Sequence, residues 1–570
     1  MKKSTSNHTL VGVGIAIPFV AFIAMLFTYA VNVPWMDDID VYPDFLGKFL
    51  AATSANEKWW LLFKPNNEHR VVYAKLINLA HYYLTGSLNM RTLTILANST
   101  LLGILWILWR VVKEQRLAPI YFLPIPFLLL QPQYYLTSLW TITGFQYQPV
   151  IFFGLLGMYL LTKSSKWALT GAIAAVIFDS FTMSNGMFYW IAGLLILWLQ
   201  GNYKRSVIWG ICMLLTINVY FLHFDNGANQ QGFAYFAQHP HESFLGFFTH
   251  LGGSLDFFNT IGIVKRAILP TLFGLILVSI IGYWLIAFVL FSKQKPFSWL
   301  PFSHQSKLGQ LQDRLAINQS NYVILGGVIF LLINALVIAV LRPRFGFDVM
   351  IVGNYKVYPA MFLTMTYLVI ITSWQRVQSN KVFLYGFISA SILFNCLSYA
   401  KFLPEVHERR KDLLVRIYNQ QYNKIGLGPQ IYSPFYDYVN TAMDKVVSKG
   451  IYHYPEGFYS DMTTQLHEGL ANKPRIAAKI TKTDAGVLVQ SETLTNTRGL
   501  NDGNYILLKS PSRTYLWYEK HPNYFRITRG CSVLLPNKTF EPATYQVGII
   551  HVEGAKKEIY NTHQTVTIVE

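Results

Sequence analysis

Long apolar blocks constrain this chain more than any other feature of its sequence. An α-helix needs about 20 apolar residues to cross a bilayer. Eleven blocks on this scale precede residue 401, two of them short, at residues 10–31, 92–112, 119–136, 149–162, 167–182, 187–199, 206–224, 267–291, 322–341, 357–374 and 382–400. They predict a polytopic α-helical membrane protein with about eleven transmembrane helices.

The scarcity of charge excludes several classes of protein. Of the 570 residues, 13% are charged, 52% are hydrophobic and 16% are aromatic, whereas soluble domains carry about 25% charged residues. This composition excludes intrinsic disorder, a coiled coil and an ordinary cytosolic enzyme. A net charge of +18 can indicate nucleic acid binding, but the apolar blocks favour a lipid bilayer as the partner. Three cysteines predict no disulfide framework.

The distribution of basic residues predicts the orientation. The first block follows Lys2 and Lys3, which also suits a signal peptide, but it is long and no small-residue cleavage site follows, so we expect an uncleaved anchor. With the N-terminus inside, the inner loops carry fifteen bases and two acids, and the outer segments carry eleven of each. The positive-inside rule therefore places the N-terminus in the cytoplasm. An odd number of spans places the tail on the opposite side, which in a bacterial inner membrane is the periplasm.

The tail differs in pattern from the rest of the chain. Short alternating runs bounded by turn residues predict strands at residues 486–490, 505–508, 514–518, 546–551 and 565–569. Residues 405–422 and 439–447 are predicted to be helical. We therefore expect a transmembrane domain at residues 1–400, which includes a first outer loop at 32–91, and a C-terminal extracytoplasmic α+β domain at residues 401–570.

Three acids gather directly after the first span, as Asp37, Asp38 and Asp40. Three carboxylates so close together repel one another, so they call for a compensating cation, metal or set of donors. A solvated acidic loop is the alternative. A divalent metal at Asp37 and Asp40 is possible but not favoured, and no cofactor is predicted.

The first outer loop carries a second polar motif. Amphipathic stretches at residues 43–63 and 71–84 are predicted to lie along the membrane interface. Asn67, Glu68, His69 and Arg70 lie between them. Glu, His and Arg side chains can bind hydroxyl and phosphate groups. The alternative is a helix N-cap at Asn66 or Asn67.

Basic residues also occur on the outer side, where they are disfavoured. Arginine binds phosphate through a planar fork, and a charge at membrane depth indicates a functional site by default. Snorkelling to lipid headgroups is the alternative. The residues concerned are Arg342, Arg344, Lys265, Arg266 and Lys356.

The order of these motifs resembles the GT-C class of bacterial membrane glycosyltransferases. The Asp-Asp pair is followed by Asn-Glu-His-Arg at 67–70, Gly-Phe-Gln at 144–146, Asn-Gly at 185–186 and Arg-x-x-Phe-Gly at 342–346. In architecture the chain is similar to the O-antigen serotype-converting glucosyltransferases. Members often have Arg-Tyr where this chain has Asn354-Tyr355, which shifts the expected role to Arg344 or Lys356.

The resemblance implies transfer of a sugar, such as glucose, from a polyprenyl-phosphate (undecaprenyl-type) donor to a hydroxyl of a glycan such as the O-antigen of lipopolysaccharide, with inversion. Asp38 or Asp37 would be the base and Asp40 would orient it. The donor phosphate would be bound by Arg70, Arg342, Arg344, Lys265, Arg266 and Lys356. The sugar or acceptor would be bound by Glu68, His69, Asn67, Trp140, Gln146, Asn185 and Tyr355.

Two other classes of protein are weighed against this enzyme. A transporter or flippase for a lipid-linked or glycan substrate would have ionisable residues in mid-span and broken helices at repeat positions. A membrane scaffold would need no acids near several outer arginines. No nucleotide-binding motif is present in the sequence, so an ATP-driven pump is not expected.

Overall fold

The computed structural model describes residues 2–67, 69–224, 227–290, 307, 311, 315, 318–428, 431–495, 499–520 and 529–568. The chain forms two compact units. The first, here the helical unit, comprises Met1–Thr28, Leu62–Leu76 and Thr94–Phe402. The second, here the mixed unit, comprises Tyr29–Leu61, Ile77–Leu93 and Leu403–Glu570.

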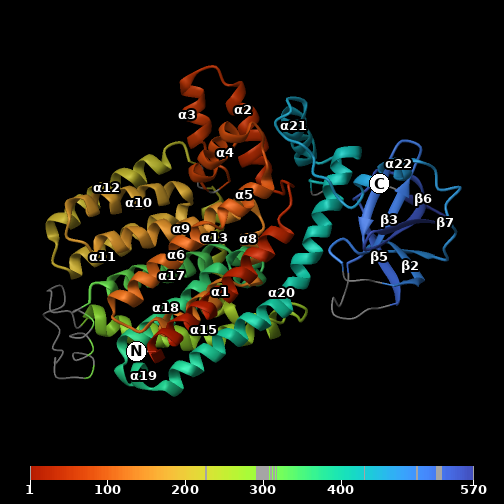
Figure 1. Cartoon of the computed structure of the whole chain (residues 1–570). Coiled ribbons are helices and arrows are strands. Elements are labelled where there is room, and N and C mark those ends of the chain that lie inside the picture. Colours follow the sequence, from red (N-terminus) through yellow and green to blue (C-terminus); the bar gives the residue numbers. More distant parts are fainter. Residues whose placement is uncertain are drawn as a thin grey trace. The chain divides into compact units, whose positions relative to one another are not determined.

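The α-helices make up most of the chain (Figure 1). Their bounds are α1 Lys2–Tyr29, α2 Phe45–Ala51, α3 Ala55–Phe63, α4 Val72–Thr85, α5 Met90–Ala97, α6 Thr100–Glu114, α7 Pro124–Leu129, α8 Tyr135–Ser138, α9 Thr141–Leu161, α10 Lys166–Thr182, α11 Phe188–Leu199, α12 Tyr203–Phe221, α13 Gly227–Gln238, α14 Pro240–Leu251, α15 Ile263–Leu285, α17 Ser320–Leu341, α18 Val357–Ser373, α19 Gln375–Ser379, α20 Lys381–Asn423, α21 Pro434–Ser448 and α22 Thr463–His467.

Short 3₁₀ and π helices connect these elements. The 3₁₀ helices are Pro119–Phe122, Pro132–Tyr134, Ser184–Met187, Gly253–Leu255, Pro343–Phe345, Phe347–Ile351, Gly353–Tyr355 and Ser460–Met462, and the π helices are Asp40–Asp44 and Ile286–Leu290.

Six helices of the described residues are long and apolar enough to cross a membrane. A seventh qualifies if Phe347–Tyr355 and Val357–Ser373, which meet at a bend of 82°, form one broken span. The six are Thr9–Tyr29, Met90–Glu114, Thr141–Leu161, Ile263–Val289, Ser320–Leu341 and Lys381–Asn423. A mostly helical chain with several apolar helices is confirmed, but the predicted count of eleven is not. The orientation depends on that count and stays a prediction.

Two predicted spans take a different form in the structure, and proline explains one of them. The block at residues 119–136 contains four prolines and folds into short helices instead of one, because a helix-interior proline lacks a donor N–H and clashes with the preceding turn. Conversely, the span predicted at residues 382–400 and the helix predicted at 405–422 form one helix, because α20 runs for 43 residues through Pro404.

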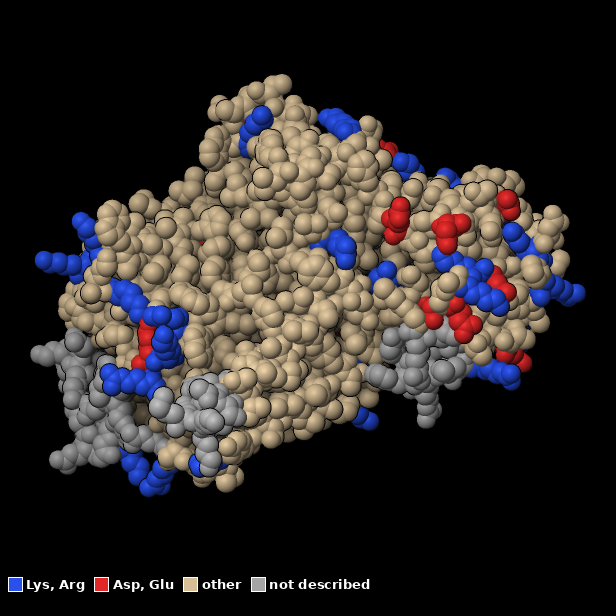
Figure 2. Space-filling view, in the orientation of Figure 1, with Lys and Arg blue, Asp and Glu red and all other residues tan. Residues whose placement is uncertain are grey.

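The helical unit buries one side of its helices and exposes apolar side chains on the other. Within it, α9 packs against α6, α10, α11 and α17. Leu215, Leu272 and Leu393, on α12, α15 and α20, are each more than half exposed. The face of this unit seen in Figure 2 is broad and carries few charged side chains. A large apolar surface of this kind is compatible with contact to lipid.

Seven described strands form two antiparallel sheets in the C-terminal part of the mixed unit. The orders are β1-β2-β5 and β4-β3-β6-β7. The bounds are β1 Lys479–Thr483, β2 Gly486–Thr495, β3 Gly503–Lys509, β4 Thr514–Tyr518, β5 Arg529–Pro536, β6 Ala543–Glu553 and β7 Lys556–Ile568. The C-terminal β domain is therefore confirmed. The prediction identified five of these strands and missed β1 and β5.

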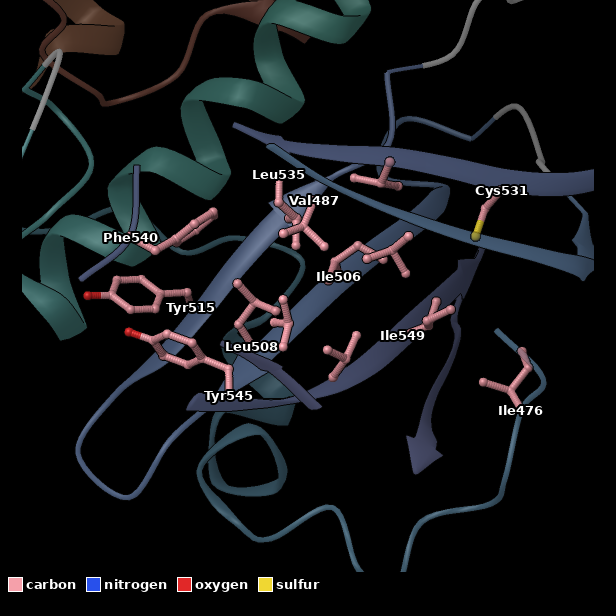
Figure 3. Packing of buried hydrophobic residues seen from close by; sticks show 14 of the residues in the cluster. Ile476, Val487, Ile506, Leu508, Tyr515, Cys531, Leu535, Phe540, Tyr545 and Ile549 are labelled. Atoms are coloured by element: carbon pink, nitrogen blue, oxygen red, sulfur yellow. The ribbon is translucent and has the colours of Figure 1, made fainter. Parts of the chain in front are cut away.

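Side chains of both sheets share one apolar core (Figure 3). Val487 and Leu535 come from the smaller sheet, and Ile506, Leu508 and Ile549 from the larger. The opposite face of the larger sheet is covered by a second core that includes side chains of α20. Because both of its faces are buried, β3 is almost continuously apolar, whereas β5 alternates between buried and exposed positions.

Candidate functional site

A cavity of about 110 Å³ in the helical unit brings together four predicted residues from distant segments. They are His69, Asn185, Arg342 and Tyr355. The wall also includes Tyr147, Ser184, Tyr220, Asn334 and Tyr358, together with apolar side chains. A cationic side chain, an imidazole, two amides and several phenols thus face one small space.

A tight turn positions His69. The backbone N–H of Asn66 donates to the His69 carbonyl at 2.8 Å, and the His69 N–H donates back to the Asn66 carbonyl at 3.1 Å. Asn67 has a φ of +51°, a conformation that asparagine adopts more readily than most residues. Helix α4 begins at Val72, so neither asparagine is its N-cap. In the cavity wall, Nδ1 of His69 lies 2.8 Å from the Ser184 hydroxyl.

Asn185 organises the polar wall of the cavity. Its side-chain N–H groups donate to Oδ1 of Asn334 at 2.9 Å and to the Tyr358 hydroxyl at 2.7 Å. Within the described residues, Oδ1 of Asn185 and Nδ2 of Asn334 are buried without a hydrogen-bond partner. Buried amides normally satisfy all their groups. Asn185 and Asn334 therefore each carry one unsatisfied polar group in the cavity wall.

Asp179 lies directly behind this wall, and the sequence analysis did not identify it. It is fully buried near the end of α10, and neither carboxyl oxygen has a hydrogen-bond partner among the described residues. A Cβ added at Gly186 would lie 2.9 Å from the Asp179 carboxyl carbon and 2.4 Å from its carbonyl oxygen. In the Asn-Gly motif, Asn185 thus lines the cavity, and Gly186 leaves room for Asp179 because it has no side chain.

Arg342 and Tyr355 form the opposite part of the lining. Arg342 follows the last turn of α17, and its guanidinium lies 5.9 Å from the centre of the Phe345 ring. Tyr355 packs edge-on against Tyr147 and His250, at 5.8 and 6.2 Å between ring centres. Burial lowers the pKa of His250 to about 4, although a hydrogen bond with the Met350 carbonyl opposes the shift. His250 is therefore neutral at physiological pH.

Arg70, which was predicted to bind phosphate, has structural partners instead. Its Nε donates to the Tyr220 carbonyl at 2.7 Å, and its other nitrogens donate to the carbonyls of Phe63 and Leu222. Two of these carbonyls belong to the end of α12, where a cation compensates the helix dipole. Arg70 is buried and does not line the cavity.

Arg266 and Lys356 share one buried acid. The Arg266 guanidinium donates two hydrogen bonds to the Asp256 carboxylate, at 2.7 and 2.6 Å. Nζ of Lys356 lies 2.8 Å from the same carboxylate. Burial raises the pKa of Asp256, but Arg266 and Lys356 outweigh it, so the pKa is lowered overall. Asp256 is thus the shared counter-charge of two cations, and neither of them lines the cavity.

The other predicted residues of the helical unit do not line the cavity. Arg344 stacks on Phe345 at 4.5 Å, and Lys265 is exposed. Asn67, Trp140 and Gln146 are likewise not in the lining, although Tyr147 next to Gln146 is. Glu68 lies outside the described residues.

The three clustered acids belong to the mixed unit and differ in exposure. Asp37 is exposed, Asp38 is buried and Asp40 is half-buried. Oδ2 of Asp38 accepts the backbone N–H of Trp35 at 3.0 Å, as the acid of a capping box does. Asp40 begins the π helix Asp40–Asp44, and π turns are frequent at functional sites. We call residues 37–44 the acidic turn.

The C-terminal part of the same unit contacts the acidic turn. The hydroxyl of Tyr438, on α21, donates to Oδ1 of Asp40. The guanidinium of Arg409, on α20, stacks 4.1 Å from the centre of the Trp35 ring. Both residues were missed, because nothing in the sequence connects positions about 400 residues apart. Asp179 was missed for another reason, although a single acid in an apolar block was a usable signal.

Among the described residues, no group of three or more His, Cys, Asp or Glu is placed to hold a metal ion. A metal at Asp37 and Asp40 thus stays an untested alternative. No family model, curated protein or solved structure matches this chain.

Proposed function

We propose that this protein is an inverting glycosyltransferase that uses a polyprenyl-phosphate sugar as donor. The convergence of His69, Asn185, Arg342 and Tyr355 on one cavity carries the proposal. Amide, imidazole and phenol groups suit sugar hydroxyls, and an arginine suits phosphate. Ligand sites usually measure about 300–1,000 Å³, so a cavity of about 110 Å³ suits one sugar ring or phosphate and not a whole lipid.

The proposed reaction assigns a separate task to each set of residues. Asp37 or Asp38 takes the proton of the acceptor hydroxyl, whose oxygen then bonds to the anomeric carbon. The bond between that carbon and the phosphate oxygen breaks, and polyprenyl phosphate leaves as an anion. Arg342 stabilises the developing negative charge. His69, Asn185 and Tyr355 hold the sugar.

The acceptor in this proposal is a hydroxyl of a cell-surface glycan, such as O-antigen. Transfer takes place on the periplasmic side of a bacterial inner membrane. The support is the excess of basic residues in the predicted inner loops and the several apolar helices. The resemblance in motif order points to the same acceptor class.

An assay with purified protein tests the proposal. The full chain in detergent or nanodiscs is given a polyprenyl-phospho-glucose and an O-antigen oligosaccharide, and glycosidic product is measured by mass spectrometry. Asp37→Asn, Asp38→Asn and Arg342→Gln are compared with Asp348→Asn, which removes an exposed acid of the helical unit. We expect transfer activity to fall about 100-fold or more in Arg342→Gln and in whichever aspartate substitution removes the base. The control should keep full activity. Transfer that survives both aspartate substitutions would overturn the base assignment.

Asp179 favours a second candidate, a transporter for a lipid-linked or glycan substrate. A buried acid in an apolar helix is typical of proton-coupled transport. The same preparation in vesicles distinguishes the two functions. Movement of the lipid-linked sugar across the bilayer without a glycosidic bond would establish transport, and product formation establishes the transferase.

A further inference from the structure

A contact of the mixed unit that the proposed function leaves unused joins α21 to the acidic turn. The Tyr438 hydroxyl donates to Oδ1 of Asp40. Helix α21 packs against the π helix Asp40–Asp44 and against α2. The approach is close, because a Cβ added at Gly47 would lie 3.6 Å from Cγ1 of Val446 and 3.7 Å from Cβ of Lys445. The packing of α21 against the turn thus brings the Tyr438 phenol to Asp40.

The surroundings of Tyr438 keep it a hydrogen-bond donor. Burial raises its pKa far above the usual value of 10, and the hydrogen bond and charge of Asp40 and then the charge and hydrogen bonding of Asp44 raise it further. The phenol therefore stays protonated over the whole range in which a glycosyltransferase would work. A donor that cannot ionise favours the charged form of the carboxylate it contacts.

Several charged groups share this environment. On the turn itself are Asp37, Asp38 and Asp44, and α2 contributes Lys48, whose Nζ lies 2.6 Å from Oδ2 of Asp44. Helix α21 contributes Lys445 beside Gly47, and Arg409 of α20 lies over Trp35. Lys48 thus contacts Asp44, and the Tyr438 phenol lies close to both carboxylates, with its hydrogen bond to Asp40.

We propose that Tyr438 is a positioning residue that holds the Asp40 carboxylate in one orientation and in its ionised form. The C-terminal segment then completes the acidic turn, which gives residues 403–570 a role in the reaction. This inference rests on the proposed function, together with the role that the motif resemblance implies for Asp40, to orient the catalytic base. Without the phenol, Asp40 loses a charge-assisted hydrogen bond and its proton affinity rises.

Tyr438→Phe tests the inference, with Tyr436→Phe as the matched control on the same helix. Tyr436 is also half-buried and packs against the β-sheet core. In the transferase assay, we expect Tyr438→Phe to lower kcat about tenfold and to move the acidic limb of the kcat/KM profile upward by about one pH unit, as the loss of one charge-assisted hydrogen bond implies. Tyr436→Phe should leave the profile in place.

A second measurement separates positioning from folding and from the proposed function. The carboxyl of Asp40 is titrated by infrared difference spectroscopy. The spectrum of the Asp40→Asn variant is subtracted from that of the protein with Asp40, once with Tyr438 present and once with Tyr438→Phe. We expect the midpoint to rise in Tyr438→Phe. In the Asp40→Asn background, the pH profile should no longer respond to Tyr438→Phe.

The outcomes distinguish the two claims. Wild-type protein that forms no glycosidic bond overturns the proposed function. An unmoved Asp40 midpoint in a folded Tyr438→Phe variant overturns the inference about Tyr438, whether or not the wild type transfers sugar. An equal loss of activity in Tyr436→Phe would also overturn it, because the effect would then belong to helix packing.

Discussion

At the scale of single residues, Asp256 is the counter-charge for two cations of the helical unit. Its lowered pKa means that the ion pairs stabilise the fold above the ordinary aspartate value of 3.8, and that this stability is lost as the pH falls through the lowered pKa. We expect Asp256→Asn to destabilise the protein by about 3 kcal/mol at pH 7, because Arg266 and Lys356 lose their partner. Thermal unfolding in detergent measures this, with Asp348→Asn as the control. The stability difference between Asp256→Asn and wild type should shrink below about pH 4, and a difference that stays constant there would contradict the assignment.

Gly186 provides a second test at this scale. A methyl group there would meet the backbone oxygen of Asp179 at 2.4 Å, so the turn that carries Asn185 must shift. We expect Gly186→Ala to cost about 1–3 kcal/mol and to weaken binding of a sugar in the cavity. Gly210→Ala, where nothing lies within 4 Å, is the control. Calorimetric unfolding compares the two variants, and equal stabilities would show that the turn is not constrained.

At the scale of elements, two asparagines of α20 protect the edge strand β4. Asn419 exchanges two hydrogen bonds with the backbone of Leu516, at 2.8 and 2.9 Å. Asn423, one turn later, does the same with Thr514 at 2.8 and 3.3 Å. A helix that covers an exposed strand edge prevents unwanted strand pairing.

Replacement of either asparagine by alanine should expose this edge. We expect Asn419→Ala to destabilise the mixed unit by about 1–3 kcal/mol, because buried backbone groups lose their partners. Hydrogen exchange should accelerate at the Leu516 amide in Asn419→Ala and at the Thr514 amide in Asn423→Ala. Gln421→Ala on the same helix is the control, and exchange that rises equally there would contradict the specific pairing.

At the scale of the whole molecule, the orientation of the chain is the main prediction. In cells, Glu492→Cys in the tail should react with a membrane-impermeant maleimide without permeabilisation, whereas Lys204→Cys should react only afterwards. Both positions are exposed. The three native cysteines need not react with the maleimide. Burial raises the pKa of Cys531 to about 12, and Cys212 and Cys396 can be changed to alanine. Labelling of Lys204→Cys in intact cells would show that the chain has the opposite orientation.

The two parts of the chain were predictable to different degrees. Short apolar runs bounded by turn residues at 486–490 and 514–518 identified strands, because this pattern is local to each segment. The missed strand Arg529–Pro536 has an alternating pattern, but a Gly-Cys-Ser opening obscures it. The block at residues 119–136 contains four prolines, which make it unsuitable for a single transmembrane helix. The prediction of a span there considered only the apolar content of the block.

The sequence by itself determined that the chain is mostly helical, that several helices are apolar enough for a membrane and that a β domain follows. These properties depend on local composition and periodicity. Only the tertiary structure decided that His69, Asn185 and Arg342 line one cavity, that Asp179 lies behind it, and that Tyr438 binds Asp40. These contacts depend on how distant helices pack, and packing is set by the shape and burial of many side chains at once. The same rule applies to Arg70, whose sequence neighbours suggested phosphate but whose partners in the fold are backbone carbonyls.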